Sequence, residues 1–380
     1  MPTRRANVGV ALLVCAAALL LGLLFAAKVS HKMPDFEVYW TAASRARAAE
    51  PLYRSEDGHY QFKYLPAFAV LTTPLAAMPL QSAKAVWFVA AVVLVTVLVW
   101  LSLALLPEQR KARWVLTTLT LVVMLKFYGH ELVLGQMNVL FGVVVACAAV
   151  AMRQGREGAA GVLIALALVV KPYAVIFLPW LLARRRGASI GAAAGGVAAV
   201  VAVPALLYGM SGDIELHRAW WKTVTESTVP NLTNADNVSI AAMWAKWIGA
   251  GPAATAMTAA TSAIVIAAAV FVCVRRRGLP FPEGLEAALL LTCVPLLSPQ
   301  GWDYVFLVST PAIVFVVNYE DLLPPFVRVA AIAALLTIGL SVYDLMGRAA
   351  YGAFMALSVI SLCYFVVVAT LCTLRARAIA

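Results

Sequence analysis

Apolar runs that are long enough to cross a lipid bilayer make up most of this chain, and short clusters of Lys and Arg separate them. The first run covers residues 8–27, and at 1.5 Å per residue a helix of that length spans about 30 Å of hydrocarbon. Basic clusters such as those at 110–113 and 275–277 are typical of the cytoplasmic ends of membrane helices. The pattern predicts an all-α polytopic membrane protein.

The composition excludes several other classes of protein. Hydrophobic residues make up 63% of the chain and charged residues 12%, whereas soluble globular domains are about half apolar and about a quarter charged. The net charge of +11 comes from the short basic clusters, so we do not expect nucleic acid as a partner. All six cysteines lie in apolar segments without a CxxC pair, which is typical of small buried side chains rather than disulfides or metal ligands.

The number of crossings follows from the rule that basic clusters stay on the cytoplasmic side. Two such clusters must be separated by an even number of helices, so residues 114–152 are predicted as two helices with an external turn at 126–131 and 135–138. Residues 158–183 are predicted as two short segments that meet at Lys171 and Pro172, a pattern that indicates a binding cavity. The whole chain, 1–380, then forms one domain of about 12 helices in the cell or inner membrane, with both termini cytoplasmic.

Two long polar segments are predicted to lie outside the membrane, at residues 28–84 and 209–251. The first combines aromatic residues with Arg, which suits the headgroup layer, so we expect short interfacial helices there. The second contains Trp220 and Trp221, a pair that also suits interface anchoring. All four histidines fall on the external face, so we expect any chemistry there.

Asp35 is the key residue of the first polar segment. It follows Met33 and Pro34, directly after the first apolar run. One interpretation is that Asp35 caps a short helix, because an Asp at a helix entry satisfies free backbone N–H groups. The other is that Asp35 is a general base, which takes a proton from a hydroxyl whose reaction partner is a lipid-borne group.

Motifs along nearly the whole chain resemble glycosyltransferase family 87, of the GT-C class. They occur in the family's order: Asp35-Phe36-x-x-Tyr39, Pro51-Leu52-Tyr53, Tyr64-x-Pro66, Gly135-Gln136-x-Asn138, Lys171-Pro172, Asn237-x-Ser239 and Ser298-Pro299-x-x-Trp302. The resemblance implies a GT-C-type bundle and transfer of a sugar, typically mannose, from a polyprenyl-phosphate donor. It also implies that Asp35 is the base. Similar proteins often carry a His after the motif's Trp, where this chain has Asp303.

Inverting transfer needs a base for the acceptor hydroxyl and a cationic site for the departing phosphate. We expect the acceptor to be a glycolipid or glycan, and no cofactor or metal. The residues expected to bind the donor phosphate are Lys126, His130, Lys171 and Arg218. Those expected to bind the sugar or the acceptor are Glu37, Tyr39, Tyr64, Gln136, Asn138, Asn237, Trp302 and Asp303.

Three alternatives stay open from the sequence. A secondary transporter with 12 helices agrees with the helix count and the broken helices, although the two halves are not similar. Asp35 and Glu37 form a carboxylate pair of the kind that holds Mg²⁺ or Mn²⁺. A lipid-phosphate transferase or ligase on a similar scaffold would move a whole glycan or a phosphate group instead of one sugar.

Overall fold

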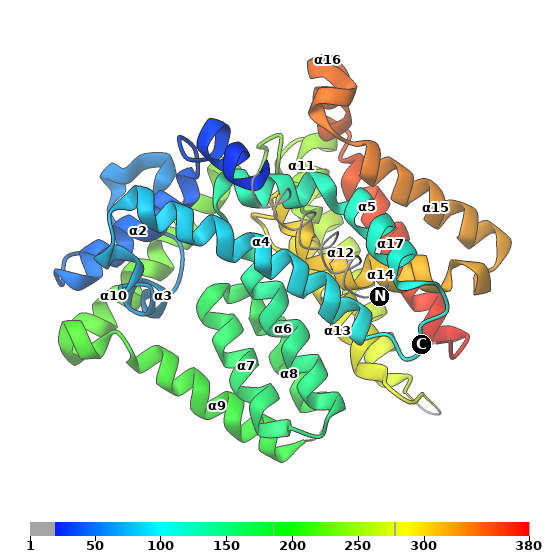
Figure 1. Cartoon of the computed structure of the whole chain (residues 1–380), viewed down its shortest axis with the longest axis horizontal. Coiled ribbons are helices and arrows are strands. Elements are labelled where there is room, and N and C mark those ends of the chain that lie inside the picture. The colour runs from blue at the N-terminus through cyan, green and yellow to red at the C-terminus, as the bar shows by residue number, and fades with distance from the viewer. Residues whose placement is uncertain (1–19, 185, 277–278, 380) are drawn as a thin grey trace, which may run out of the picture.

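The structure is a computed structural model that describes residues 20–379 apart from 185, 277 and 278. Helices and short helical turns form all of the regular structure in these residues (Figure 1). A single pair of residues, Asn237 and Trp302, forms an isolated antiparallel bridge between two loops. The prediction of an all-α protein is therefore confirmed, whereas most of the predicted span at 8–27 lies outside the described residues.

Within the residues that the structure describes, five helical segments are long and apolar enough to cross a membrane: α4 (Leu80–Ala104), α5 (Arg113–Leu134), α12 (Pro252–Val274), Asp303–Leu322, and α17 (Val359–Ala376). The fourth consists of η5 (Asp303–Ser309), α14 (Thr310–Tyr319) and η6 (Glu320–Leu322). Two bent pairs raise the number to seven if each counts as one span. They are α9 (Gly187–Ala202) with α10 (Ala205–Asn231), bent by 89°, and α15 (Pro325–Leu340) with α16 (Tyr343–Ala356), bent by 108°.

The prediction of about 12 crossings is not confirmed, because several predicted spans are short helices. They are α6 (Asn138–Arg153), α7 (Glu157–Val170) and α13 (Pro282–Leu297). A helix of 16 residues is roughly 24 Å long, which is less than the hydrocarbon thickness of about 30 Å. Sequence periodicity marks such segments as buried and apolar, but it does not show whether each one crosses the bilayer.

The chain breaks at Lys171 and Pro172, as predicted. Lys171 has an extended backbone, which a residue before proline prefers, and it ends α7. The chain then continues as η4 (Pro172–Ile176) and α8 (Phe177–Ala183). The helix α9 packs closely on α7, because a Cβ at Gly161 would lie 2.2 Å from the Ser189 carbonyl oxygen.

Residues 28–84, the first polar segment, contain short helices as predicted. These are η1 (Phe25–Val29) at its edge, α2 (Pro34–Arg47), η2 (Ser55–Tyr60), α3 (Pro66–Leu71) and η3 (Leu75–Ala77). Residues 209–251, the second polar segment, are mostly helical too, because α10 continues to Asn231 and α11 (Ile240–Ile248) follows. The helix α10 contacts α3, so the two polar segments meet in the fold.

One predicted turn is wrong. Residues 126–131 belong to α5, and the turn after it is confined to 135–137. The polar side chains that suggested a turn are satisfied within the bundle, since Lys126 pairs with Asp303 and Glu131 accepts a hydrogen bond from Asn138. Burying paired polar groups is compatible with a continuous helix.

The helices α13 and α14 form the buried centre of the bundle, and α4, α5, α6, α12 and α17 surround them. The loops that carry the basic clusters contact one another at one side of this centre. Arg110 pairs with Asp321 at 2.6 Å, while Glu286 pairs with both Arg184, at 3.2 Å, and Arg276, at 2.7 Å. Loops that are far apart in sequence therefore lie together.

Candidate active site

A cavity of about 700 Å³ lies where the two polar segments meet the break at Lys171. Five parts of the chain line it: α2 with η2 and the loop after η2, the turn after α5, the break after α7, α10 and the loop after it, and the loop before η5 with the start of η5. The lining residues that carry polar or aromatic groups include Asp35, Tyr39, His59, Tyr60, Lys63, Tyr64, Gln136, Lys171, Tyr173, Trp220, Trp221, Asn234, Asp236, Ser298, Gln300, Trp302 and Tyr304. A concave site with converging polar groups is the usual form of a ligand site.

Asp35 lies in the first turn of α2 and lines this cavity. Pro34 begins the helix, where its missing N–H group is not needed. Met33 is the N-cap residue of α2, and no side-chain cap hydrogen bond is found there, so the capping interpretation of Asp35 is not supported. Met33 precedes the helix in a left-handed conformation, and its N–H group donates to the Val133 carbonyl oxygen at 2.9 Å.

The turn after α5 holds the start of α2 in place. Gly135 has a φ of 71°, and a Cβ there would lie 2.7 Å from the Phe36 Cβ. Only glycine combines this conformation with so close a contact. The next residue, Gln136, extends its side chain into the cavity, so the same contact sets the position of Asp35 relative to Gln136.

Burial raises the pKa of the Asp35 carboxyl above its ordinary value. The nearby amide of Gln136 and the positive charges of Lys171, His59 and Lys63 oppose this rise in the pKa. Burial also lowers the pKa of the Lys63 amine, and the charge of Asp35 opposes that change. The carboxyl is thus suited to proton transfer nearer neutral pH than an exposed Asp.

A network of hydrogen bonds joins the walls of the cavity around Gln136. The hydroxyl groups of Tyr39 and Tyr64 lie 2.6 Å apart, and the Tyr39 hydroxyl donates to the Gln136 Oε1 at 3.0 Å. The Gln136 Nε2 donates to the Tyr304 hydroxyl at 3.2 Å. Lys171 donates to the Tyr64 hydroxyl and, at 3.4 Å, to the Gln136 Oε1. The network places one buried ammonium group among hydroxyl and amide groups that can bind a sugar or a phosphate.

Asn138 supports the turn from behind the cavity. Its Nδ2 donates to the Glu131 Oε2 at 2.9 Å, and the N–H group of Val139 donates to the Glu131 Oε1 at 2.7 Å. Glu131 and Asn138 are both fully buried and do not line the cavity. Glu131 therefore caps the start of α6 and fixes the turn that carries Gln136.

Lys126, His130 and Asp303 form a separate ionic cluster that does not line the cavity. The Lys126 Nζ lies 2.8 Å from the Asp303 carboxylate, and the His130 Nδ1 lies 3.7 Å from it. Both Lys126 and Asp303 are nearly fully buried, so the two charges largely neutralise each other. The residues on either side of Asp303, Trp302 and Tyr304, do line the cavity, so the cluster anchors that wall.

The remaining predicted site residues lie elsewhere. Arg218 is exposed on α10 and is not among the lining residues. Asn237 is buried, and its Nδ2 donates to the carbonyl oxygens of Asn231, at 3.1 Å, and Pro299, at 3.0 Å, so it joins two lining loops. Glu37 pairs with Lys84 at 2.5 Å and lines a second, neighbouring cavity.

The carboxylates of Asp35 and Glu37 do not converge as a metal-binding pair would. Residues two apart on a helix point to different sides, and these two line different cavities. The two carboxylates therefore do not form a shared metal site.

Several lining residues were not expected from the sequence. Lys63, Tyr173, Gln300 and Tyr304 are among them, and His59 had been noted only as part of the external face. Three of these, Lys63, Tyr173 and Gln300, directly adjoin motif residues, and that adjacency was the available signal. The Trp220 Nε1 donates to the Lys63 carbonyl oxygen at 3.1 Å, so α10 also fixes the backbone that carries Lys63.

Comparison with known proteins then gives the family. The model of glycosyltransferase family 87 matches residues 62–299, which is more than half of the chain. The chain belongs to glycosyltransferase family 87. Searches of curated proteins and of solved structures found no match. The family 87 protein is accordingly a glycosyltransferase, and its apolar helices agree with a multi-pass membrane location.

The family match covers much of the cavity but not all of it. Lys63, Gln136 and Lys171 lie inside the matched range, whereas Asp35 and Trp302 lie outside it. The role of Asp35 therefore depends on the geometry of this family 87 enzyme itself.

Proposed function

We propose that this enzyme transfers a sugar, mannose in the first instance, from a polyprenyl-phosphate donor to a hydroxyl group of a glycolipid or glycan acceptor. Transfer is inverting and takes place on the external side of the cell membrane, with Asp35 as the general base. The single observation that supports this most is the position of Asp35, which lines a cavity of about 700 Å³ together with His59, Lys63 and Lys171.

The proposed reaction is a displacement at the anomeric carbon. Asp35 takes the proton of the acceptor hydroxyl while that oxygen forms a bond to the anomeric carbon. The bond between this carbon and the phosphate oxygen breaks, and its electron pair leaves with the polyprenyl phosphate. The raised pKa of Asp35 makes the carboxylate a better proton acceptor than an exposed one, and nearby cations stabilise the charge on the phosphate.

We assign the phosphate site to Lys171, Lys63 and His59. Of the four cations first expected there, Lys171 is kept, because its ammonium group is directed to the hydroxyl of Tyr64 in the cavity wall. Lys126 and His130 are excluded from the proposal because they lie beside Asp303, and Arg218 is excluded because it is exposed. A cation that is neutralised by a buried carboxylate attracts a substrate phosphate only weakly.

The sugar itself is proposed to bind among the polar and aromatic groups of the same cavity. Tyr39, Tyr64 and Gln136 form the hydrogen-bonded wall, and Trp302 adds an aromatic face. Aromatic rings bury much apolar area and leave one polar edge for a hydrogen bond, which matches the mixed surface of a sugar ring. Asn138, Asn237 and Asp303 are proposed to hold the walls rather than to contact the sugar.

The proposed side of the membrane follows from the basic loops. These loops contact one another, and Lys and Arg clusters favour the cytoplasm. The cavity is formed by the polar segments that connect the other helix ends, so we assign it to the external side. One domain of 1–380 and cytoplasmic termini belong to the same proposal.

The test is transfer by the purified, reconstituted enzyme. Radiolabelled polyprenyl-phosphate mannose and an alkyl mannoside acceptor are supplied to the wild type, to Asp35→Asn and to Asp344→Asn, a control at an exposed position on α16. Loss of the base is expected to lower the rate by a factor of about 10² to 10⁴. The control is expected to keep the wild-type rate, and NMR spectroscopy of the product is expected to show inverted anomeric configuration.

Three results would contradict the proposal. Wild-type activity in a folded Asp35→Asn variant would exclude Asp35 as the base. Counterflow of an unmodified substrate across vesicles, without a new glycosidic bond, would favour the transporter instead. Transfer of a whole glycan or of phosphate would favour the ligase or phosphate transferase.

A further inference from the structure

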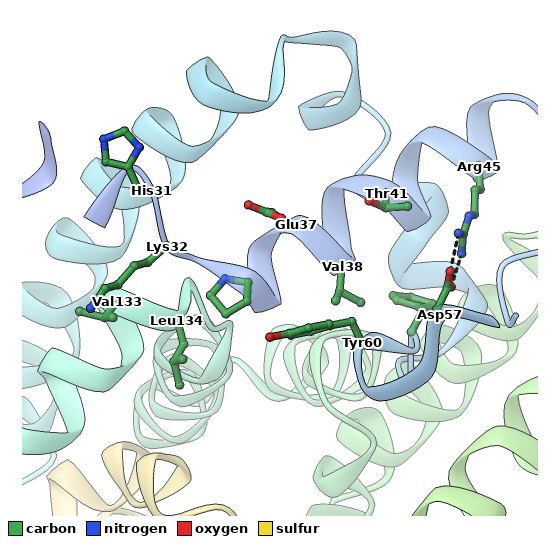
Figure 2. Close-up of a pocket in the computed structure, with 12 residues that line it drawn as sticks. His31, Lys32, Glu37, Val38, Thr41, Arg45, Asp57, Tyr60, Val133 and Leu134 are labelled. Atoms are coloured by element: carbon green, nitrogen blue, oxygen red, sulfur yellow. Dashed lines mark hydrogen bonds and ion pairs between the residues drawn. The ribbon is translucent and has the colours of Figure 1, made fainter. Parts of the chain in front are cut away.

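A second cavity, of about 650 Å³, adjoins the first on the other side of α2. The two cavities share four lining residues: Pro34, Val38, Tyr60 and Leu134. Pro34 directly precedes Asp35, so the second cavity begins next to the proposed base. Figure 2 shows this cavity with its side chains, and nothing in the proposed transfer of a single sugar uses it.

The second cavity has a fixed wall. Glu37, Val38, Thr41 and Arg45 recur at intervals of one to four residues and form one face of α2 toward the cavity (Figure 2). The guanidinium group of Arg45 donates to both carboxylate oxygens of Asp57, at 2.5 and 2.8 Å. A bidentate pair of this kind fixes geometry as well as charge, so it holds η2 and its last residue against α2.

Two polar groups of this cavity, those of Glu37 and Thr41, are available to a ligand. Lys84, which is 2% exposed, holds the Glu37 Oε1 at 2.5 Å, while the Glu37 side chain is 48% exposed. No hydrogen bond to the Glu37 Oε2 or to the Thr41 hydroxyl is found in the part of the chain that the structure describes. Tyr60, which is 54% exposed, adds an aromatic ring at the boundary with the first cavity.

A positioned carboxylate, a free hydroxyl and an exposed aromatic ring suit a carbohydrate better than a hydrocarbon chain. A prenyl or acyl chain would leave the Glu37 Oε2 and the Thr41 hydroxyl without a hydrogen-bond partner, which is unfavourable. Sugar hydroxyls can bond to both groups, and the tyrosine ring can cover the apolar side of a sugar. The cavity volume is within the range of ordinary ligand sites.

We propose that the second cavity binds the part of an oligosaccharide acceptor that is remote from the reacting hydroxyl. The terminal sugar of the acceptor lies at Asp35 in the first cavity, and the following units pass Tyr60 into the second. The acceptor is then a glycan of two or more sugar units rather than a simple alcohol. This inference rests on the proposed function, because it needs the first cavity to be the site of transfer.

The test measures how acceptor length affects the rate. The reconstituted enzyme is given polyprenyl-phosphate mannose and octyl glycosides that carry one, two or three mannose units. We expect kcat/KM to be about tenfold higher with two or three units than with one, equal to 1.4 kcal/mol of added transition-state binding. Thr41→Phe, which fills the second cavity, is expected to remove this preference, and Thr41→Leu to reduce it.

A matched control is Thr96→Phe, at an exposed position on α4 outside both cavities, and it is expected to keep the preference. Thermal unfolding of each variant shows whether it is folded. Equal kcat/KM for all three acceptors in the wild type would overturn only the proposed role of the second cavity. An equal loss of kcat/KM for all three acceptors in folded Thr41→Phe and Thr41→Leu would do the same. Absence of transfer to every acceptor would instead overturn the proposed function, and the acceptor cavity with it.

Discussion

The contact between Gly135 and Phe36 gives the sharpest prediction, because it connects backbone geometry to the position of Asp35. In Gly135→Ala the new Cβ would lie 2.7 Å from the Phe36 Cβ and 2.9 Å from the Met33 Cε. Both neighbours are fully buried, so neither side chain can move away freely. The left-handed conformation destabilises alanine by about 1–2 kcal/mol, and overpacking adds about 1–3 kcal/mol.

The new Cβ at position 135 is expected to displace the first turn of α2, and this turn carries Asp35. A displacement of about 1 Å at a reacting group lowers a rate by about 10²-fold. We therefore expect Gly135→Ala to lower both the thermal stability and kcat.

Gly155 provides a matched control. Its φ is 72°, close to the 71° of Gly135, but a Cβ there would have nothing within 4 Å. Gly155→Ala therefore carries the conformational strain without the contact. We expect it to lower the unfolding temperature less than Gly135→Ala and to leave kcat near the wild-type value. Thermal unfolding and transfer assays on the two purified variants make the comparison, and equal effects of both substitutions would refute the reasoning.

The remaining predictions concern the charged residues of the cavity and of the separate cluster at Asp303. Because burial raises its pKa and the base acts in the ionised form, kcat/KM is expected to fall as the pH decreases, with a midpoint above the ordinary value of 3.8. Lys63→Met removes a positive charge that lowers this pKa, so the midpoint in that variant should move to higher pH. A midpoint at or below 3.8 in the wild type would exclude Asp35 as the titrating group. Lys171→Met is expected to lower kcat/KM for the donor by about 10²-fold, because a charge-stabilising group of the transition state is lost. Lys126→Met should instead act mainly on stability, by about 3–5 kcal/mol, since it leaves Asp303 buried without its partner; an equal kinetic effect of the two substitutions would contradict the separate roles.

Part of the candidate site could be predicted from single segments of sequence. The residue before Pro172 has an extended backbone, and that local preference located the break at Lys171. Tyr39, Tyr64 and Gln136 were expected to bind the sugar or the acceptor, and all three line the same cavity. The sequence left Asp35 and Glu37 open as a carboxylate pair, whereas in the structure the two residues line different cavities.

The partners of the charged residues could not be predicted in this way. Lys126 and Lys171 are similar in sequence terms, since each is a single lysine next to an apolar run. The fold brings Asp303 to Lys126 from a segment 177 positions away in the chain, and it leaves Lys171 in the cavity beside Tyr64. Periodicity along one segment shows which face of it is apolar, but it carries no information about distant segments.

The sequence by itself thus determined the helical class of this protein, its membrane character, its two polar segments and its family. Only the tertiary structure decided which of the polar residues share a cavity and which neutralise one another. The physical reason is that hydrophobicity and backbone preference act along a few neighbouring residues, whereas the charge that a buried group retains depends on the side chains that other helices pack against it.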